Sequence, residues 1–497
     1  MLQLISGILI SLGLSLVSSI VYNLWLHPLA SVPGPILGRS CLLWRFYHSM
    51  SGRYHRAIEE EHRKHGPVFR VSPNELSFAS VTSWKAIYGH PPTGQSPCLK
   101  SEFYDVFAAG YDSKCIGSER DPDRHAEMKK NLGAAFSTKA LAGQEQVITD
   151  CVRGMLAKLR VKGSLPEGLN MTHWYEMIAF DILGEMAFGE SFRCIEKEEP
   201  HFWFKMLTKY LFFITLVDNL RRLPAVLAIG RLIAPLTAGI QEKNHSYSRD
   251  LIRRRLAKRG ARKDFLTNMV DKVETGSVST EELTAHSATL VVAGGETIST
   301  FLASTTYYLC KYPSCLRILQ SELRGRFATV EEITATAASQ LPYLQAVIQE
   351  ALRIFPPGSQ GFPRLSPGKL IDDVWIPRGT EVYTSAWTVT HNENYFKDPY
   401  CFVPERWLDS NSEDVREASQ PFSLGPRGCI GRNFAMVEAN LILATILFEF
   451  DVELVDPEQE WESKCRMHVN WLKPDLPVRF RRRSLIHPGH SISGRTP

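Results

Sequence analysis

The sequence predicts a mainly α-helical protein with a small β region, and three observations support this fold class. The pattern of apolar and charged positions predicts that residues 50 to about 355 are mainly helical. Strand-like alternation is confined to short pieces, such as residues 68–78 and 381–383. Beyond these helical stretches the chain becomes rich in proline and glycine, and a helical pattern returns only at residues 433–448.

The composition is ordinary for a globular protein of 497 residues, with 44% hydrophobic and 22% charged residues. A net charge of +4 gives no reason to expect nucleic-acid binding. Ten cysteines are scattered along the chain without a CxxC pair, which argues against a zinc module and against a secreted disulfide framework. We therefore expect a reducing environment that faces the cytosol.

Residues 1–26 carry no charge and predict a single-pass transmembrane anchor. At a rise of ~1.5 Å per residue, such a stretch spans the ~30 Å hydrocarbon core of a bilayer. A cleaved signal peptide is the alternative, but it would begin with basic residues and have a shorter apolar run. Arginines follow from Arg39 onward and no basic residue precedes the segment, so the positive-inside rule places the body in the cytosol.

Residues 27–38 contain three prolines within eight residues, which predicts a stiff, extended hinge between the anchor and the body. No repeat, low-complexity tract or linker divides the chain after this hinge. We expect one folded domain over residues 39–484, followed by a C-terminal tail over residues 485–497.

One long helix can be placed near the middle of the chain. Ser279 and Glu282 form a capping-box pattern, apolar residues continue to Leu309, and Pro313 supplies the stop. About thirty helical residues would extend ~45 Å and could cross a whole domain. The centre reads Ala293-Gly-Gly-Glu-Thr297. Each glycine weakens a helix by ~1 kcal/mol relative to alanine, which suggests the close approach of a flat or bulky group.

Two other segments could contact a ligand. Residues 90–120 are rich in proline, glycine and serine and predict a long irregular loop, which usually has a function in a compact domain. Residues 201–217 are unusually aromatic. A core helix is the simplest interpretation of this stretch, and a substrate-channel or membrane-dipping element is the alternative.

Cys429 carries the strongest chemical signal. Gly425 and Gly431 allow the backbone to turn tightly, so that N–H groups can point at the sulfur. A helical pattern begins near Arg432, and the positive end of a helix dipole favours a thiolate. A thiolate is a good axial ligand for iron and favours cleavage of an O–O bond. For a lone cysteine the alternative is a buried, inert thiol.

The loop around this cysteine matches, at every fixed position, the haem-binding loop of the cytochrome P-450 family: Phe422-xx-Gly425-x-Arg427-x-Cys429-x-Gly431. The sequence resembles that family over essentially its whole length. Four further stretches agree in the family's order, namely the anchor with its Pro-Gly-Pro hinge, Ala293-Gly-Gly-Glu-Thr297, Glu350-Ala-Leu-Arg353 and Phe402-Val-Pro-Glu-Arg-Trp407. The resemblance implies the cytochrome P-450 fold and a haem b whose iron is bound by Cys429.

The resemblance also implies roles for two smaller groups of residues. Glu350 and Arg353 would both bind Arg406 in a buried charge triad with a structural role. Thr297 would order water and deliver protons for oxygen activation, with Glu296 as the acidic relay. The alternative for Thr297 is a hydroxyl bonded back to its own helix.

Haem propionates need cationic or hydrogen-bonding partners. By resemblance, the candidates are Arg427, Arg364 and the pair His125-xxx-Lys129, in which lysine stands where arginine is commoner and offers a point charge in place of a fork. By position, the substrate pocket would be lined by aromatic and small residues and would suit a mostly apolar molecule. The expected lining is the loop at Phe103, Tyr104 and Phe107, residues 201–217, the helix near Val292, and residues 358–362.

The implied function is a monooxygenase acting on an apolar small molecule. Because no flavin or nicotinamide domain is evident, the electrons are expected from a membrane-bound NADPH-cytochrome P-450 reductase, with cytochrome b5 as a second candidate donor. The resemblance places the enzyme at the endoplasmic reticulum, in the style of fungal specialised metabolism. A relative that rearranges an oxygenated substrate, and a haem-binding or membrane scaffold protein without catalysis, are the competing hypotheses. The intact Glu296-Thr297 pair argues against both.

Overall fold

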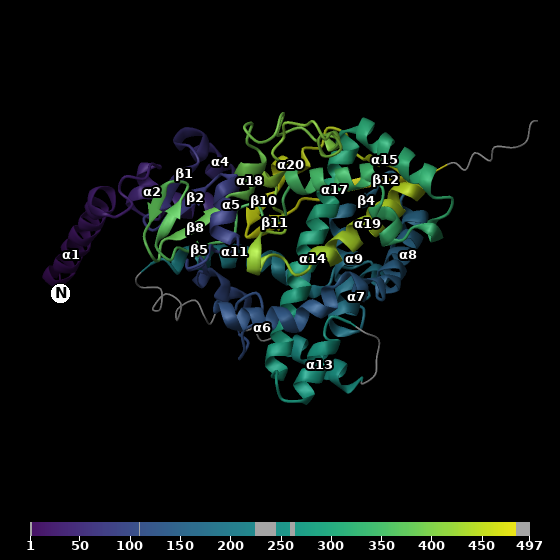
Figure 1. Cartoon of the computed structure of the whole chain (residues 1–497), viewed down its shortest axis with the longest axis horizontal. Helices are drawn as coiled ribbons and strands as arrows, with labels where there is room; N and C mark the ends of the chain where they lie inside the picture. The colour runs from purple at the N-terminus through teal and green to yellow at the C-terminus, as the bar shows by residue number, and fades with distance from the viewer. Residues whose placement is uncertain (1, 109, 224–244, 259–263, 484–497) are drawn as a thin grey trace, which may run out of the picture.

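Helices form most of the body of the protein, and α1 (Leu2–Val21) extends away from one end of it (Figure 1). The structure is a computed structural model that describes residues 2–108, 110–223, 245–258 and 264–483. The predicted fold class, mainly α with a small β region, is confirmed. The expected C-terminal tail lies outside the described residues.

The described α-helices fall into an N-terminal and a C-terminal group. The first contains α1, α2 (Ile36–Ser40), α3 (Leu43–Met50), α4 (Tyr54–His65), α5 (Val81–Tyr88), α6 (Pro122–Gly133), α7 (Thr138–Ala142), α8 (Glu145–Lys162), α9 (Met171–Phe188), α10 (Cys194–Lys197) and α11 (Phe202–Leu220). The second contains α13 (Thr267–Glu274), α14 (Thr280–Lys311), α15 (Pro313–Arg326), α16 (Ala335–Ser339), α17 (Pro342–Ile354), α18 (Ala386–Thr390), α19 (Arg432–Glu449) and α20 (Trp461–Lys464).

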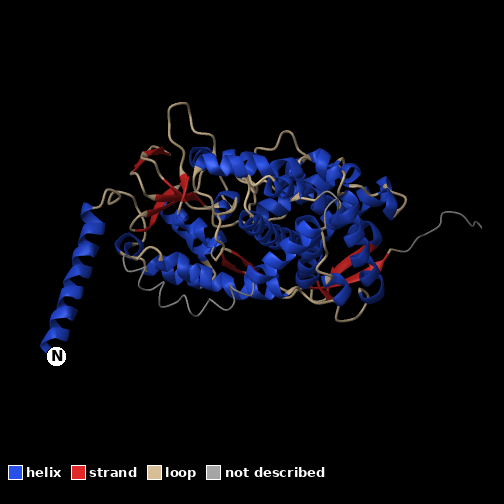
Figure 2. Ribbon diagram, turned by 90° about the horizontal axis from the view of Figure 1, so that it is seen from below, coloured by secondary structure: helices blue, strands red, loops and turns tan. Residues whose placement is uncertain are grey.

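The strands form small sheets at opposite ends of the body (Figure 2). Near α1, a five-stranded sheet has the order β1-β2-β8-β5-β3, in which only the β2–β8 pair is parallel. Its strands are β1 (Val68–Ser72), β2 (Glu75–Phe78), β3 (Leu99–Lys100), β5 (Arg364–Leu365) and β8 (Glu381–Thr384). The remaining strands are β4 (Leu169–Asn170), β12 (Pro477–Arg482) and β9 (Phe450–Leu454), which pair in that order, and the hairpins β6–β7 (Lys369–Ile371, Val374–Ile376) and β10–β11 (Arg466–His468, Asn470–Leu472).

The long helix predicted at the centre is α14, which packs on α9, α17 and α19. The Ser279 side chain accepts from the N–H of Glu282, and the helix ends two residues before Pro313, as predicted. The two central glycines face α9. A Cβ on Gly294 would lie 3.0 Å from the Leu183 side chain, and one on Gly295 would lie 2.8 Å from the ring of Phe180. The glycines therefore let α9 approach α14 closely.

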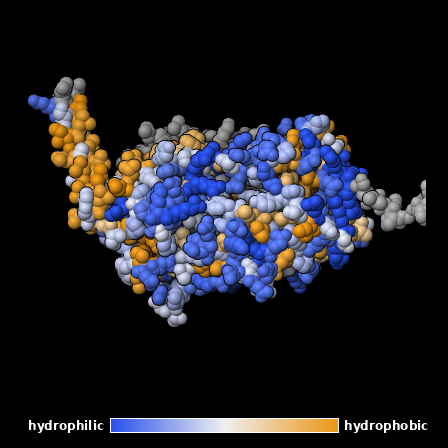
Figure 3. Space-filling view, turned by 90° about the horizontal axis from the view of Figure 1, so that it is seen from above, coloured by the Kyte–Doolittle hydropathy of each residue, from blue (hydrophilic) through white to orange (hydrophobic). Residues whose placement is uncertain are grey.

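The N-terminal helix is long and apolar enough to cross a membrane. The apolar span covers Gln3–Leu26, 24 residues, and an 18-residue stretch of it has a mean hydropathy of 2.3 and is not buried against the body. Asn23, near the end of the span, is buried. Its last residues form a π-helical turn, Tyr22–Leu26. Figure 3 shows this apolar helix projecting from the body, with apolar surface continuing beside it. Exposed side chains in the adjoining residues include Ile36, Leu37, Leu43 and Tyr47.

The expectation of an extended hinge was wrong. Residues 28–31 form turns, and Leu29 and Val32 are buried in the core beside the five-stranded sheet. Arg70 of β1 donates to the carbonyl oxygen of Asn23 over 2.7 Å, and its backbone N–H donates to Pro33 over the same distance. Apolar burial and these bonds fold the proline-rich segment onto β1, so the connector is stiff but compact.

The aromatic stretch predicted as a helix is α11, and its far end is held by a buried charge network. Trp203 is buried and Phe212 is 44% exposed, so the helix combines a core face with an accessible one. Arg45 of α3 donates to Glu75 over 2.7 Å and to Asp218 over 2.5 Å. Those contacts fasten the end of α11 to the five-stranded sheet.

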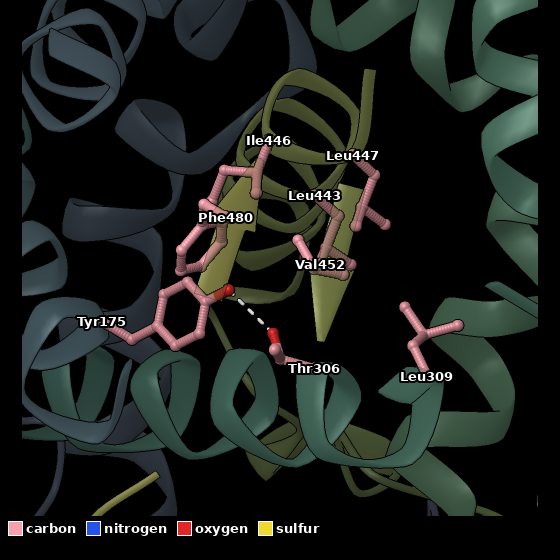
Figure 4. A pocket seen from close by; sticks show the side chains of 8 residues that line it. All are labelled: Tyr175, Thr306, Leu309, Leu443, Ile446, Leu447, Val452 and Phe480. Atoms are coloured by element: carbon pink, nitrogen blue, oxygen red, sulfur yellow. Dashed lines mark hydrogen bonds between the residues drawn. The ribbon is translucent and has the colours of Figure 1, made fainter. Parts of the chain in front are cut away.

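The core between α9, α14 and α19 is tightly packed. It encloses a cavity of about 10 Å³, barely the space of one water molecule (Figure 4). The hydroxyls of Tyr175 and Thr306 hydrogen-bond to each other over 2.7 Å at its edge. The other lining residues are apolar, and none of the predicted site residues is among them: Leu309, Leu443, Ile446, Leu447, Val452 and Phe480.

Candidate active site

Cys429 lies in a tight loop that ends at the first turn of α19. Its N–H donates to the carbonyl oxygen of Phe422 over 2.9 Å, which closes the loop on itself. Gly425 has a φ of +66°, and a Cβ there would collide with the carbonyl oxygen of Tyr88. The glycine is required by this close approach and by its left-handed conformation. Cys429 itself is solvent-accessible, and all ten cysteines are free thiols.

The protein surroundings of the Cys429 thiol act in opposite directions. Desolvation by the dense surrounding protein raises the pKa of the thiol. The backbone N–H groups of Gly431 and Arg432 and the nearby ammonium of Lys129 lower that pKa. These donors at the start of α19 are the predicted arrangement for holding a negative sulfur. Such a sulfur is suited to ligate a metal ion that supplies further positive charge.

Thr297 and Glu296 are neighbours on α14 but point into different environments. Between Glu282 and Leu309, only Ala293 and Thr297 are exposed, and they share one helix face. The Thr297 hydroxyl donates to the Ala293 carbonyl oxygen over 2.8 Å. Glu296 is buried and accepts from Nζ of Lys473 over 2.9 Å. The acid therefore pairs with a lysine that the sequence pattern did not identify.

The charge triad is present and fully buried, with one difference from the expectation. Arg353 donates two hydrogen bonds of 2.8 Å to Glu350, and Arg406 donates to the same carboxylate over 3.2 Å. The two arginines do not pair with each other, because like charges repel and Glu350 serves both. Trp407 adds an indole N–H at 2.9 Å, and Asp414 binds Arg406 at 2.5 Å. The binding of these last two partners was not predicted from the sequence.

Four basic side chains, those of Arg427, Arg364, Lys100 and His125, converge near the cysteine loop. Burial, followed by Lys100 and Arg427, lowers the pKa of His125 to about 3. Burial, Arg427 and Arg364 lower the pKa of Lys100 to about 6. Among the residues that the structure describes, none of the four forms an ion pair with a carboxylate. Basic groups that disfavour one another's charged forms fit an anionic cofactor such as haem, because its two propionates would stabilise those charges.

Comparison with known proteins agrees with this arrangement. The family model described as Cytochrome P450 matches residues 31–480. The chain belongs to the cytochrome P-450 family. It is 56% identical to "Cytochrome P450 monooxygenase ORF9" of Penicillium roqueforti, over 96% of this chain and 92% of that one. It is 51% identical to "Cytochrome P450 monooxygenase BOT4" of Botryotinia fuckeliana, over 95% and 90%.

A solved structure shares the cytochrome P-450 fold. The chain in "Crystal structure of cytochrome P450DA heme domain" is 18% identical, with a TM-score of 0.77 over 91% of this chain and 97% of that one. Family membership identifies the protein as a haem-iron monooxygenase. Both of the relatives named above are fungal proteins.

Lys129 lies beneath the cysteine loop. Its Nζ donates to the carbonyl oxygens of Pro426 and Gly428 over 2.8 and 3.0 Å. Burial lowers the pKa of Lys129, while Cys429 raises it. In this position the lysine supports the loop that carries the sulfur, whereas His125, four residues earlier, belongs to the cluster of four basic side chains.

Lys100 is the cofactor candidate that the sequence did not reveal. It sits on the two-residue strand β3 and donates to the carbonyl oxygens of Ile116 and Gly117 over 2.8 and 2.7 Å. Its partner Arg364 on β5 bonds to the hydroxyl of Tyr104. A lysine in a polar loop is usually solvated, so only the pairing of β3 with β5 marks this one as buried.

Several residues expected to line the substrate pocket do meet. The ring of Tyr104 lies 6.0 Å from that of Phe107 and 6.2 Å from that of Phe362. The carbonyl oxygen of Phe107 accepts from Thr289 of α14 over 3.4 Å. The loop, the start of β5 and the central helix are thus brought together. Gly117 fits under this loop, since a Cβ there would lie 3.0 Å from the Thr289 methyl group.

Proposed function

We propose that this cytochrome P-450 hydroxylates or epoxidises an apolar small molecule in a fungal secondary-metabolite pathway. It would use O2 and electrons from NADPH, delivered by a separate reductase. The observation that carries the proposal is the accessible Cys429 in its glycine-built loop, at the positive end of α19. The fungal monooxygenases to which the chain is 51–56% identical support the pathway class.

Haem b, when bound, supplies the oxidising chemistry of the reaction. Cys429 would hold its iron, with Phe422, Gly425 and Gly431 shaping the loop. The four basic side chains near the cysteine loop would hold its propionates: Arg427, Arg364, His125 and Lys100. Lys129 would fix the loop from below. These assignments follow from charge and burial around the sulfur.

Thr297 would hold a proton at its hydroxyl on the accessible face of α14, and Glu296 would supply that proton from the buried side. Proton transfer of this kind typically contributes ~10²–10⁴-fold to a rate. The Thr297 hydroxyl bonds to Ala293 in this structure. It must rotate to serve a water molecule, which a serine or threonine on a helix can do without changing the backbone.

The substrate is proposed to be mostly apolar because three aromatic rings lie together beside the central helix α14. Tyr104, Phe107 and Phe362 form the described part of that lining. A few polar groups, such as the Thr289 hydroxyl, would orient it.

The enzyme is proposed to sit in the endoplasmic reticulum membrane with its catalytic domain in the cytosol. The 24-residue apolar helix and the arginines that follow it support this orientation. NADPH-cytochrome P-450 reductase would be the electron donor, with cytochrome b5 as a second one. Protease protection of a C-terminally tagged chain in microsomes tests the topology. A protected tag would contradict it.

The central test uses Cys429→Ser. The reduced, carbon-monoxide-bound wild-type protein should show the red-shifted Soret band of a thiolate-ligated haem, and the variant should lose it. Survival of the band would overturn the assignment. With a reductase, steady NADPH consumption that yields a hydroxylated or epoxidised product supports the monooxygenase. A rearranged product without NADPH use supports an isomerase-like relative.

A further inference from the structure

A buried cluster of two acids and one lysine lies behind the accessible face of α14. Nζ of Lys473, just after β11, lies 2.9 Å from Glu296 of α14 and 3.4 Å from Glu176 of α9. It also donates to the hydroxyl of Thr300 over 3.1 Å. The side chains of Lys473, Glu176 and Glu296 are only 1%, 1% and 5% exposed. Three separate elements thus meet at one ammonium group.

The cluster has one carboxylate more than its single cation can neutralise. An uncompensated charge buried in a protein is strongly unfavourable, so a buried acid without a partner keeps its proton instead. The two carboxyl groups raise the pKa of Lys473 above its usual value, although burial lowers it, so the lysine stays charged. Neutrality is reached when one of the two acids is protonated.

Geometry indicates which acid holds the proton. Glu296 makes the shorter contact with Lys473 and a true hydrogen bond, whereas neither oxygen of Glu176 has a hydrogen-bond partner among the described residues. The groups that face Glu176 are Lys473, Glu296 and Asp475. Burial raises the pKa of Glu176 to about 8, against the lowering effect of Lys473. Glu296 is therefore the anion of the pair and Glu176 the neutral acid.

We propose that Glu176 stores a proton for Glu296, and that Lys473 is a positioning residue that exchanges partners when this proton moves. The proton leaves the hydroxyl of Glu176 and joins the carboxylate of Glu296. Lys473 then pairs with the new carboxylate of Glu176, so that the buried charge of the cluster does not change. Glu296, now neutral, loses its attraction to the ammonium and can turn toward Thr297. The inference rests on the proposed role of Glu296 as the acidic relay.

Infrared spectroscopy of the haem-loaded full chain tests the charge arrangement without measuring activity. At neutral pH the wild type should show the carbonyl stretch of a protonated carboxyl group, and Glu176→Gln should remove it. Glu296→Gln should remove the same band although Glu176 is still present. Lys473 then faces a single acid, so Glu176 ionises and loses its protonated carboxyl group. Lys473→Met should add a second band, and Lys473→Arg should restore a single one.

A matched control is available in Glu438 of α19, another buried acid whose pKa burial raises well above its usual value. Glu438→Gln should remove a different band and leave that of Glu176 unchanged. Persistence of the Glu176 band in Glu296→Gln would overturn the proposal. So would the absence of any band that depends on Glu176 in the wild type.

Turnover with a reductase tests the use of the stored proton. Glu176→Gln should reduce product formed per NADPH on the order of tenfold, less than the ~10²-fold or more expected for direct proton transfer. Its red-shifted Soret band should be unchanged, and Glu438→Gln should couple normally. Normal coupling in Glu176→Gln contradicts the storage role. If Glu296→Gln couples normally while Glu176→Gln does not, the relay role of Glu296 is wrong. The infrared result then still decides which of the two acids holds the proton.

Discussion

The ammonium of Lys129 donates to the carbonyl oxygen of Gly428 over 3.0 Å, so α6 is fastened to the residue that precedes Cys429. A second bond, of 2.8 Å, reaches Pro426 in the same loop. A lysine that binds two carbonyl oxygens holds the loop at two points. It therefore supports the sulfur through the backbone.

Lys129→Met should weaken haem retention, because hydrogen bonds from a charged donor typically contribute ~1.5–3 kcal/mol each. We expect haem to transfer to an acceptor protein roughly tenfold faster or more, since ~1.4 kcal/mol corresponds to a factor of ten. Lys130→Met is the matched control, because Lys130 is the exposed neighbour on the same helix. Equal transfer rates in the two variants would show that the loop needs no support from α6.

Arg353→Ala should abolish stable folding with haem. Arg353 neutralises Glu350 and also donates to the carbonyl oxygens of Thr390, Pro399 and Cys401 over 2.7–3.0 Å. Its removal leaves Arg406 as the shared partner of Glu350 and Asp414, so one buried negative charge is no longer neutralised, at a cost of ~3–5 kcal/mol. Haem content per protein and the thermal unfolding midpoint provide the measurement. Arg353→Lys keeps the charge but loses the fork, so it should lie between the wild type and alanine.

Lys100 should make stability depend on pH in a defined direction. Its pKa is lowered to about 6 in the folded protein, against ~10.4 in an unfolded chain. Between these values the unfolded chain binds a proton that the folded one lacks, so stability rises with pH, by at most ~1.4 kcal/mol per pH unit. Below about pH 6 both states are protonated and the dependence ends.

The slope should be steepest in protein without haem, because propionates would favour the charged lysine and raise its pKa. Unfolding midpoints measured between pH 6 and pH 9, with and without haem, provide the comparison. Lys100→Met should flatten the curve of the haem-free protein. A slope that is the same with haem would argue against a propionate near Lys100.

Local patterns predicted the elements whose signals lie close together in the sequence. The cap at Ser279, the stop at Pro313 and the glycine loop of Cys429 each depend on residues a few positions apart. The cap could be predicted because it is formed by a serine side chain and the backbone N–H of the residue three positions later. The loop was visible because glycine is needed where φ is positive.

Contacts between distant segments could not be predicted in this way. Lys473 bonds to Glu296, which is 177 positions away, and the buried Lys100 lies on β3, which pairs with the distant strand β5. The hinge folds back because Leu29 packs into an apolar core formed by residues between 68 and 88 and between 371 and 418. Such partners are set by the tertiary fold, in which burial outweighs the solvated state that a polar loop suggests.

Thr297→Ala should separate oxygen activation from haem binding. Among the described residues, the Thr297 hydroxyl has only backbone partners, at 2.8 and 3.4 Å. Its loss should therefore leave no buried group unpaired and change the unfolding midpoint little. Haem content and the red-shifted Soret band should match the wild type. Product per NADPH should fall ~10²-fold, with the missing electrons recovered as hydrogen peroxide or water. Thr297→Ser retains the hydroxyl and should couple nearly normally. Unchanged coupling in the alanine variant would show that this hydroxyl only caps its own helix turn, as its present bond to Ala293 does.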